Sequence, residues 1–137
     1  MEVGQPSWWN DAKAHLSNDD LLGPVIQEYN DGCLEGRGDV FCTVIRAIVG
    51  QQISVLAADA VWGRLEAFVG VITPEAVASK RPDELARCGL SRSKASYIHG
   101  LAEQSESLLS PDWSAMSDKE IHAHFTSFRG IGPWTSE

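Results

Sequence analysis

The sequence lacks the features of membrane-spanning and secreted proteins. No apolar run approaches the roughly 18 to 20 residues that a membrane span needs, and residues 1–11 hold no basic segment followed by an apolar stretch, so no secretory signal is readable. Its three cysteines, Cys33, Cys42 and Cys88, are odd in number and far apart. This spacing favours neither a disulfide framework nor a cysteine-based zinc site. The sequence predicts no membrane partner and a cytoplasmic location, nucleoid-associated if the source is bacterial.

Positive charge is also scarce. The 11 Lys and Arg residues face 19 Asp and Glu, which gives a net charge of −8. Because phosphate binding draws on clustered Lys and Arg, this balance argues against a chain that coats nucleic acid indiscriminately. Residues 79–100 are the exception, with five basic and two acidic side chains. The distribution predicts a local anion site within an acidic protein.

What the sequence does contain is helical periodicity. A length of 137 residues, 43% of them hydrophobic, predicts a single helical domain over residues 1–137. No stretch alternates strictly enough to indicate a strand. Residues 41–49 have one apolar face behind Asp39, and residues 53–68 are expected to form the central helix, with Leu56, Val61 and Leu65 buried. The predicted fold class is all-α, a compact domain of about seven short helices.

Punctuation residues divide this pattern. Thr73-Pro74 and Ser91 mark helix starts, and Ser117 with Glu120 forms a capping-box pattern. Glycines make residues 30–38 a loop, and residues 110–117 are a further connection. A helical hairpin is predicted at about residues 117–137.

The turn of that hairpin is the most informative stretch. A helix runs into Gly130-Ile131-Gly132, and Pro133 begins the next helix. Two glycines one residue apart permit positive φ and close approach of another backbone, and the amides at the following helix start form an anion site. On these residues alone, a tight helix–helix turn with no ligand explains the pattern equally well.

Three blocks in order carry a resemblance: residues 45–54 (IRAIVGQQIS), 89–98 (GLSRSKASYI) and 128–135 (FRGIGPWT). Together they resemble the helix-hairpin-helix DNA glycosylases, and within them the 3-methyladenine DNA glycosylase II (AlkA-like) branch. The resemblance runs from about residue 20 to the end. It implies an all-α fold and a monofunctional enzyme of base-excision repair that hydrolyses the N-glycosidic bond of alkylated purines such as 3-methyladenine in double-stranded DNA.

The resemblance also assigns the hairpin. Backbone carbonyls of Thr126, Phe128 and Ile131 would hold a monovalent cation that touches a DNA phosphate. Amides of Gly130, Gly132 and Trp134 would lie near the phosphate, with Thr135 beside them. Such backbone contacts anchor a strand without reading its sequence. Beyond this structural sodium or potassium ion, no cofactor is expected.

The first block is implied to fill the gap left by an extruded base. Gln51, Gln52 and Ser54 are assigned to DNA binding, and Gln52 matches the position of the family's wedge. Trp134 stands where bifunctional relatives carry a Schiff-base lysine, so no lyase chemistry is expected, and its indole suits a cationic, alkylated purine. A polar helix junction and a core tryptophan are the alternatives. Arg92 and Lys94 fit a solvated helix face as well as a phosphate contact.

Other chemistry is disfavoured. His122 and His124 lie about 200° apart on a helix, so they cannot share one metal ion. A non-catalytic helix-hairpin-helix DNA-binding module and a plain structural domain are the remaining alternatives to an enzyme.

One departure from the family concerns catalysis. The family's essential Asp lies about 20 residues beyond the hairpin, whereas this sequence stops at Glu137, which does not match that position. We therefore expect a C-terminally truncated glycosylase that is inactive alone. An exposed apolar surface is expected near Phe128 and Trp134, with self-association through that face.

Overall fold

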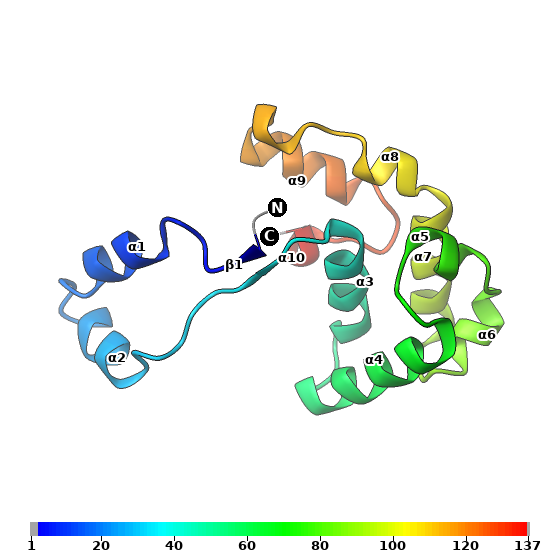
Figure 1. The fold of residues 1–137 in the computed structure, drawn as a ribbon, viewed down its shortest axis with the longest axis horizontal. Coiled ribbons are helices and arrows are strands. Elements are labelled where there is room, and N and C mark those ends of the chain that lie inside the picture. Colours follow the sequence, from blue (N-terminus) through cyan, green and yellow to red (C-terminus); the bar gives the residue numbers. More distant parts are fainter. Residues whose placement is uncertain (1–2, 137) are drawn as a thin grey trace. The chain divides into compact units, whose positions relative to one another are not determined.

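The structure is a computed structural model that describes residues 3–136. The chain divides into two compact units, residues 1–40 and residues 41–137 (Figure 1). Each unit is described by itself, and the assignment of residues 1–137 to one domain stays a prediction. Glu137, considered above as a carboxylate, lies outside the described residues.

The N-terminal unit contains β1 (Val3–Gly4), α1 (Trp9–Leu16), α2 (Leu22–Glu28) and β2 (Gly36–Arg37). The strands pair antiparallel, Val3 opposite Arg37 and Gly4 opposite Gly36. The expectation of no strand is wrong for these four residues, because two-residue strands are too short to show alternation. Gly23 is the one buried residue in α1 and α2.

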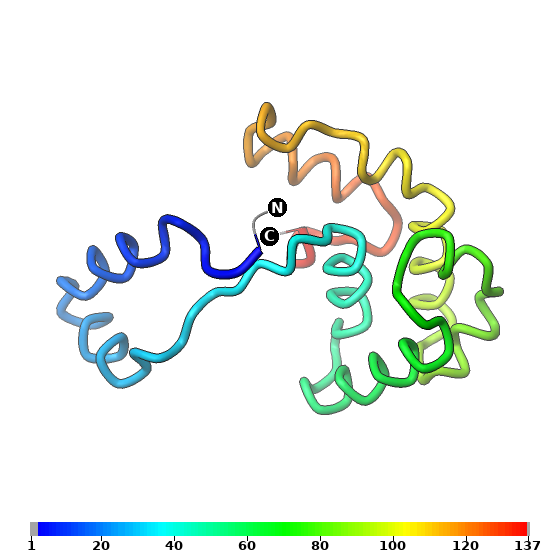
Figure 2. The backbone as a smooth tube through the Cα atoms, viewed as in Figure 1, coloured from blue at the N-terminus to red at the C-terminus, as the bar shows by residue number. Residues whose placement is uncertain are grey.

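Every regular element among the described residues of the second unit is a helix, which confirms the all-α class. Its elements are α3 (Val40–Gly50, beginning at the last residue of the first unit), α4 (Val55–Val69), α5 (Pro74–Ala78), α6 (Pro82–Ala86), α7 (Arg92–Glu103), α8 (Ser105–Leu109), a 3-10 turn (Trp113–Ala115), α9 (Asp118–Thr126) and α10 (Pro133–Ser136). Figure 2 shows the backbone passing from α9 through a short turn into α10. None of the described helices has the length and apolarity to cross a membrane.

The predicted helix starts are confirmed. The Thr73 side chain accepts from Ala76 N–H at α5, and the Ser91 side chain accepts from Lys94 N–H at α7. At α9, Ser117 accepts from Glu120 N–H while the Glu120 carboxylate accepts from Ser117 N–H at 2.8 Å. These bonds satisfy amides that have no partner within the first helical turn.

The core lies around α3 and α7 rather than around α4. Helix α3 buries five apolar side chains (Phe41, Val44, Ile45, Ile48 and Val49), and α7 buries four (Ala95, Ile98, Leu101 and Ala102). Helix α4 buries three (Val61, Trp62 and Leu65). The prediction of a central helix at residues 53–68 is therefore wrong in its placement, because the apolar face of α4 is narrower than that of α3.

The burial expected for α4 holds for Val61 and Leu65 but not for Leu56, which is 83% exposed. Ser54 caps the helix with its side chain, so α4 begins at Val55 and Ile53 precedes it. Leu56 lies nine residues before Leu65, which at 100° per residue places it on the opposite side of the helix. The number of apolar residues in 53–68 does not show that Leu56 and Leu65 lie on opposite faces of α4.

Candidate nucleic-acid interface

A cleft of about 840 Å³ lies between the C-terminal end of α3 and the α9–α10 hairpin. Nine residues line it: Ala47, Gly50, Gln51, Gln52, Gly130, Ile131, Gly132, Trp134 and Thr135. Six of the seven residues predicted to bind DNA are among them. The first and third sequence blocks, separated by more than 70 residues, thus form the two walls of one cleft.

Gln51 ties the two walls together. Its side-chain amide donates to the Gly130 carbonyl at 3.0 Å and to the Thr135 hydroxyl at 2.9 Å. Both bonds are partly buried. The amide nitrogen of Gln51 is therefore committed to the protein, and its two hydrogen bonds link the C-terminal end of α3 to the hairpin.

Gln52 follows in a conformation that side chains rarely adopt. It is the one non-glycine residue with positive φ in residues 3–136, at 57°, and it is exposed. For a residue with a Cβ this left-handed conformation costs about 1 to 2 kcal/mol. Ser54, two residues on, does not line the cleft, and its hydroxyl accepts from Ala57 N–H.

The two hairpin glycines differ. Gly130 has φ of 99°, and a Cβ there would lie 2.6 Å from the Tyr97 ring. Gly132 does not have positive φ, and a Cβ there would meet nothing within 4 Å. Of the two properties that glycine permits, positive φ applies to Gly130, whereas Gly132 has open space for the approach of another backbone.

The hairpin turn leaves several backbone amides without an acceptor. Within residues 3–136, the N–H groups of Gly130, Gly132 and Trp134 donate no hydrogen bond, whereas Ile131 N–H donates to the Phe128 carbonyl at 3.2 Å. Thr135 and Ser136 amides both donate to the Gly132 carbonyl. Arg129 N–H likewise donates no hydrogen bond among the described residues. Of these four amides, the three whose residues line the cleft are the three that the resemblance assigns to a phosphate.

Trp134 is 89% exposed at the edge of the cleft. The core-tryptophan alternative is therefore wrong. Phe128, in contrast, is only 7% exposed, because it packs edge-on against the His124 ring at 5.2 Å between centroids. The apolar surface expected near both residues is confirmed for Trp134 and wrong for Phe128.

Lys94 does not line the cleft but contacts the backbone of one of its walls. Its ammonium donates to the carbonyls of Val49 at 2.9 Å and Gln51 at 2.6 Å, so it binds the C-terminal end of α3. Burial lowers the pKa of this ammonium from its ordinary value. Neither alternative from the sequence describes Lys94, which is half-buried and contacts backbone carbonyls; Arg92 is exposed.

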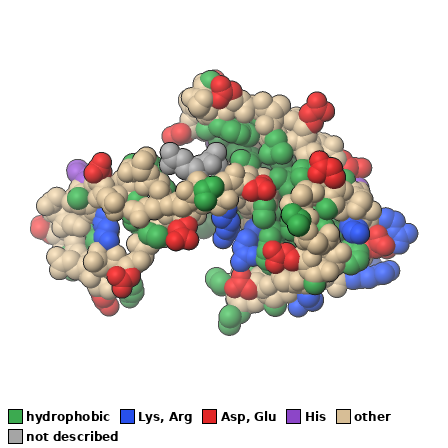
Figure 3. Space-filling view, viewed as in Figure 1, with side chains coloured by type: hydrophobic (Ala, Val, Ile, Leu, Met, Phe, Trp, Pro, Cys, Tyr) green, Lys and Arg blue, Asp and Glu red, His purple; other side chains and the backbone are tan. Residues whose placement is uncertain are grey.

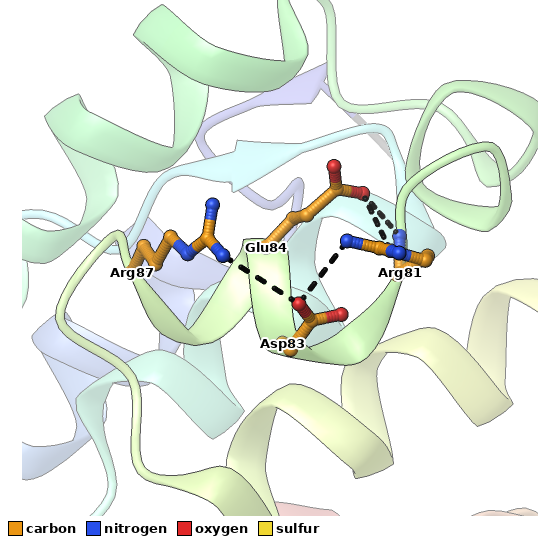
Figure 4. Close-up of polar contacts among 4 residues, drawn as sticks. All are labelled: Arg81, Asp83, Glu84 and Arg87. Carbon is orange, nitrogen blue, oxygen red and sulfur yellow. Dashed lines mark hydrogen bonds and ion pairs between the residues drawn. The ribbon is translucent and has the colours of Figure 1, made fainter.

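Two of the five basic side chains in residues 79–100 form ion pairs with acidic neighbours. Figure 4 shows Arg81 and Arg87 paired with Asp83 at 3.3 and 3.7 Å, and Arg81 with Glu84 at 3.7 Å. Lys80 lies over the Phe68 ring. On the face drawn in Figure 3, basic and acidic side chains are interspersed, with no continuous basic stripe. Backbone amides are therefore better candidates for the anion site than the side chains of residues 79–100.

The hairpin histidines each have a separate partner. His122 Nδ1 lies 2.8 Å from the Ser136 hydroxyl, and His124 Nε2 lies 3.1 Å from the Leu108 carbonyl.

The three residues predicted to supply carbonyls to a cation all lie in the hairpin: Thr126 at the end of α9, Phe128 in the turn and Ile131 in the cleft wall. The carbonyls of Thr126 and Ile131 accept no hydrogen bond from described residues outside the helices.

Sequence reasoning missed the supporting contacts that Lys94 and Tyr97 make in this site. Tyr97 packs under Gly130, and the Arg129 guanidinium lies 5.6 Å from the Tyr97 ring centroid. Lys94 and Tyr97 are three residues apart in α7, so they share one face of that helix. That spacing within the second block was the available signal.

Comparison with known proteins agrees with this geometry. Residues 45–137 match the family described as HhH-GPD superfamily base excision DNA repair protein. The chain is 27% identical over 136 residues to DNA-3-methyladenine glycosylase 1 of Schizosaccharomyces pombe, covering 92% of this chain and 60% of the relative. It is 31% identical over 111 residues to DNA-3-methyladenine glycosylase of Saccharomyces cerevisiae, covering 72% of this chain and 38% of the relative.

Solved structures show the same similarity. The 3-methyladenine DNA glycosylase of S. pombe in complex with abasic DNA superposes with a TM-score of 0.78 at 25% identity, over 92% of this chain and 66% of that one. The 3-methyladenine DNA glycosylase from Archaeoglobus fulgidus gives 0.76 at 27% identity, over 93% and 48%. The chain thus spans 60% or less of the curated relatives. Since the family match covers well over half of it, the chain belongs to the HhH-GPD superfamily of base excision DNA repair proteins.

Proposed function

We propose that this chain is the DNA-binding part of a monofunctional DNA glycosylase. That enzyme would remove alkylated purines such as 3-methyladenine from double-stranded DNA. The observation that carries the proposal is the set of three amides without acceptors, Gly130, Gly132 and Trp134, at the rim of the cleft. The names of the relatives support the substrate class, and the abasic DNA bound by one relative supports a duplex partner.

A DNA phosphate is the ligand that fits the hairpin. Backbone N–H groups bind phosphate oxygens without sequence preference, and the open space at Gly132 lets a strand approach the backbone closely. The carbonyls of Thr126, Phe128 and Ile131 offer oxygen donors for a sodium or potassium ion beside that phosphate. When bound, this ion would supply positive charge next to the phosphate, which suits a protein with net charge −8.

The opposite wall fits base extrusion. Taking a nucleotide out of the stack costs a few kcal/mol, and the space it leaves must be filled. Gln52 is exposed in its left-handed turn at one side of the cleft, and the Trp134 indole is exposed at the other. Gln52 would fill the gap, while Trp134 would stack on the cationic base, which an electron-rich indole attracts.

The cleft lacks a group that hydrolysis needs. The developing cationic sugar is stabilised by a preorganised anion, yet no Asp or Glu is among the nine cleft-lining residues that the structure describes. We infer that residues 1–137 bind damaged DNA but do not release bases. Incubation with methylated DNA should release no 3-methyladenine above a protein-free control, and release at an enzymatic rate would contradict this assignment.

The amide assignment is tested by Gly132→Val. A Cβ at Gly132 would have no atom within 4 Å apart from its chain neighbours, so we expect the fold to be retained, but the valine side chain would block a phosphate. Fluorescence anisotropy with a duplex containing an abasic site should show affinity at least about fivefold lower, the equivalent of roughly 1 kcal/mol for lost hydrogen bonds. Lys119→Ala, an exposed change in α9, is the control and should leave affinity unchanged. Unchanged affinity of folded Gly132→Val would refute phosphate binding here.

A second candidate, a non-catalytic helix-hairpin-helix DNA-binding module, is favoured by the absence of a carboxylate among the described cleft residues. The two functions differ in the DNA they prefer: a glycosylase part should bind abasic DNA more tightly than intact duplex, and a general module should bind both equally.

We also propose self-association through Trp134. It predicts a sedimentation coefficient that rises with protein concentration in the native chain and stays constant in Trp134→Ala.

A further inference from the structure

Helix α7 supports both walls of the cleft from one of its faces. Lys94 donates to the Val49 and Gln51 carbonyls, and Tyr97 packs under Gly130 one helical turn later. The same short segment of α7 therefore contacts the turn that carries Gln52 and the turn that carries the three amides without acceptors. A substitution at either contact residue of α7 would therefore alter the packing of one wall of the cleft.

The turn that carries Gln52 is weakly hydrogen-bonded within its own backbone. Its backbone hydrogen bonds are long, 3.3 Å from Gln51 N–H to the Ile48 carbonyl and 3.4 Å from Ile53 N–H to the Gly50 carbonyl. The bonds from Lys94 are shorter and charge-assisted, and such bonds are the stronger kind. Carbonyls at a helix C-terminus also carry partial negative charge, which an ammonium stabilises.

We propose that Lys94 is a positioning residue for base extrusion, which holds the Gly50–Ile53 turn so that Gln52 keeps its left-handed conformation at the cleft. This inference rests on the proposed function. It assigns Lys94 no contact with DNA, because two of its three N–H donors are already committed to protein carbonyls. Without Lys94, the strain at Gln52 has less to oppose it, and the side chain loses its fixed position.

This role differs measurably from a phosphate contact. Removing a Lys that binds a phosphate lowers the slope of log affinity against log salt by about one. Removing a positioning Lys leaves that slope unchanged and instead abolishes the contribution of the residue it positions. Two residues that act as a unit are non-additive in a double-mutant cycle.

The experiment uses the full chain with Lys94→Met, Gln52→Ala, the double variant, and Lys119→Met as the control that removes the same charge. Base unstacking is read from 2-aminopurine fluorescence in a duplex, and affinity from anisotropy across a salt series. We expect Gln52→Ala to lower the fluorescence increase at least threefold in the native background and less than 1.5-fold in the K94M background. The salt slope should be the same for native protein, K94M and K119M.

Three results are decisive. An equal effect of Gln52→Ala in both backgrounds overturns the positioning role, and a salt slope lower by about one in K94M shows a phosphate contact instead. No unstacking signal with the native chain would overturn the proposed function itself. If Lys94→Met does not fold by circular dichroism, Lys94→Arg, which keeps a cation with N–H donors, replaces it: we expect the full Gln52 effect to persist, and its loss in folded K94R would contradict the inference.

Discussion

The two turns that face each other across the cleft use the left-handed conformation in opposite ways. In the hairpin, the residue with positive φ is Gly130, which avoids strain and leaves room for the Tyr97 ring. In the α3–α4 turn, it is Gln52, which keeps a side chain at a cost of about 1 to 2 kcal/mol. Glycine would relieve that strain. The comparison indicates that the hairpin presents its backbone and the α3–α4 turn presents a side chain.

The largest expected effect concerns Gly130→Ala. The new Cβ would lie 2.6 Å from Tyr97 ring atoms at a φ of 99°, so overpacking and backbone strain add to about 3 kcal/mol or more of lost unfolding free energy. Urea denaturation measures it. Gly132→Ala is the matched control, and its unfolding free energy should stay within about 0.5 kcal/mol of native. Equal losses for both variants would remove the distinction between the two glycines.

The next effect concerns Gln51→Ala, which cuts the connection between the walls. It removes hydrogen bonds to the Gly130 carbonyl and the Thr135 hydroxyl, each worth about 1 kcal/mol, so the unfolding free energy should fall by about 1 to 2 kcal/mol. Gln104→Ala, which removes a bond to Gly100 within one exposed helical region, should cost about 0.5 kcal/mol or less. If Gln51→Ala lowers the unfolding free energy no more than Gln104→Ala does, the two Gln51 hydrogen bonds do not stabilise the contact between the walls.

A smaller effect of opposite sign is expected for Gln52→Gly. Glycine relieves the left-handed strain but raises the entropy of the unfolded chain, so the net gain in unfolding free energy should be about 0.5 to 1 kcal/mol. Under the proposed function, affinity for abasic DNA should fall at the same time, because the side chain proposed to fill the gap of the extruded base is gone. Glu66→Gly, at an exposed helical site with ordinary φ, should instead be destabilising. Stability lost in Gln52→Gly would show that the turn is not strained.

The sequence predicted the parts of the fold that depend on local signals. The caps at Thr73, Ser91 and Ser117 and the helix of residues 41–49 follow from residue types and spacing within a few positions. Leu56 was misplaced because an apolar residue contributes equally to a count whichever face it occupies. For the site, the family resemblance carried by the three blocks implied seven DNA-binding residues, of which six line the cleft. The contact of Lys94 with carbonyls 43 and 45 residues away depends on tertiary packing, which no local pattern encodes.

The smallest expected effect is a change in the pKa of Glu120, which tests the local cap at the start of α9. Helix α9 of the hairpin is capped locally: the Ser117 hydroxyl and then its N–H hold the pKa of Glu120 below its ordinary value of 4.5. A lowered folded-state pKa means that the stabilisation is present above the unfolded value and is lost as pH falls through the folded one. Ser117→Ala should raise the pKa of Glu120 toward 4.5 in an NMR titration. Ser127→Ala, which removes a bond at the other end of α9, should leave it unchanged. A Glu120 pKa that does not move in Ser117→Ala would mean that the Ser117 hydroxyl does not hold the carboxylate, and that the start of α9 is not stabilised by this local cap.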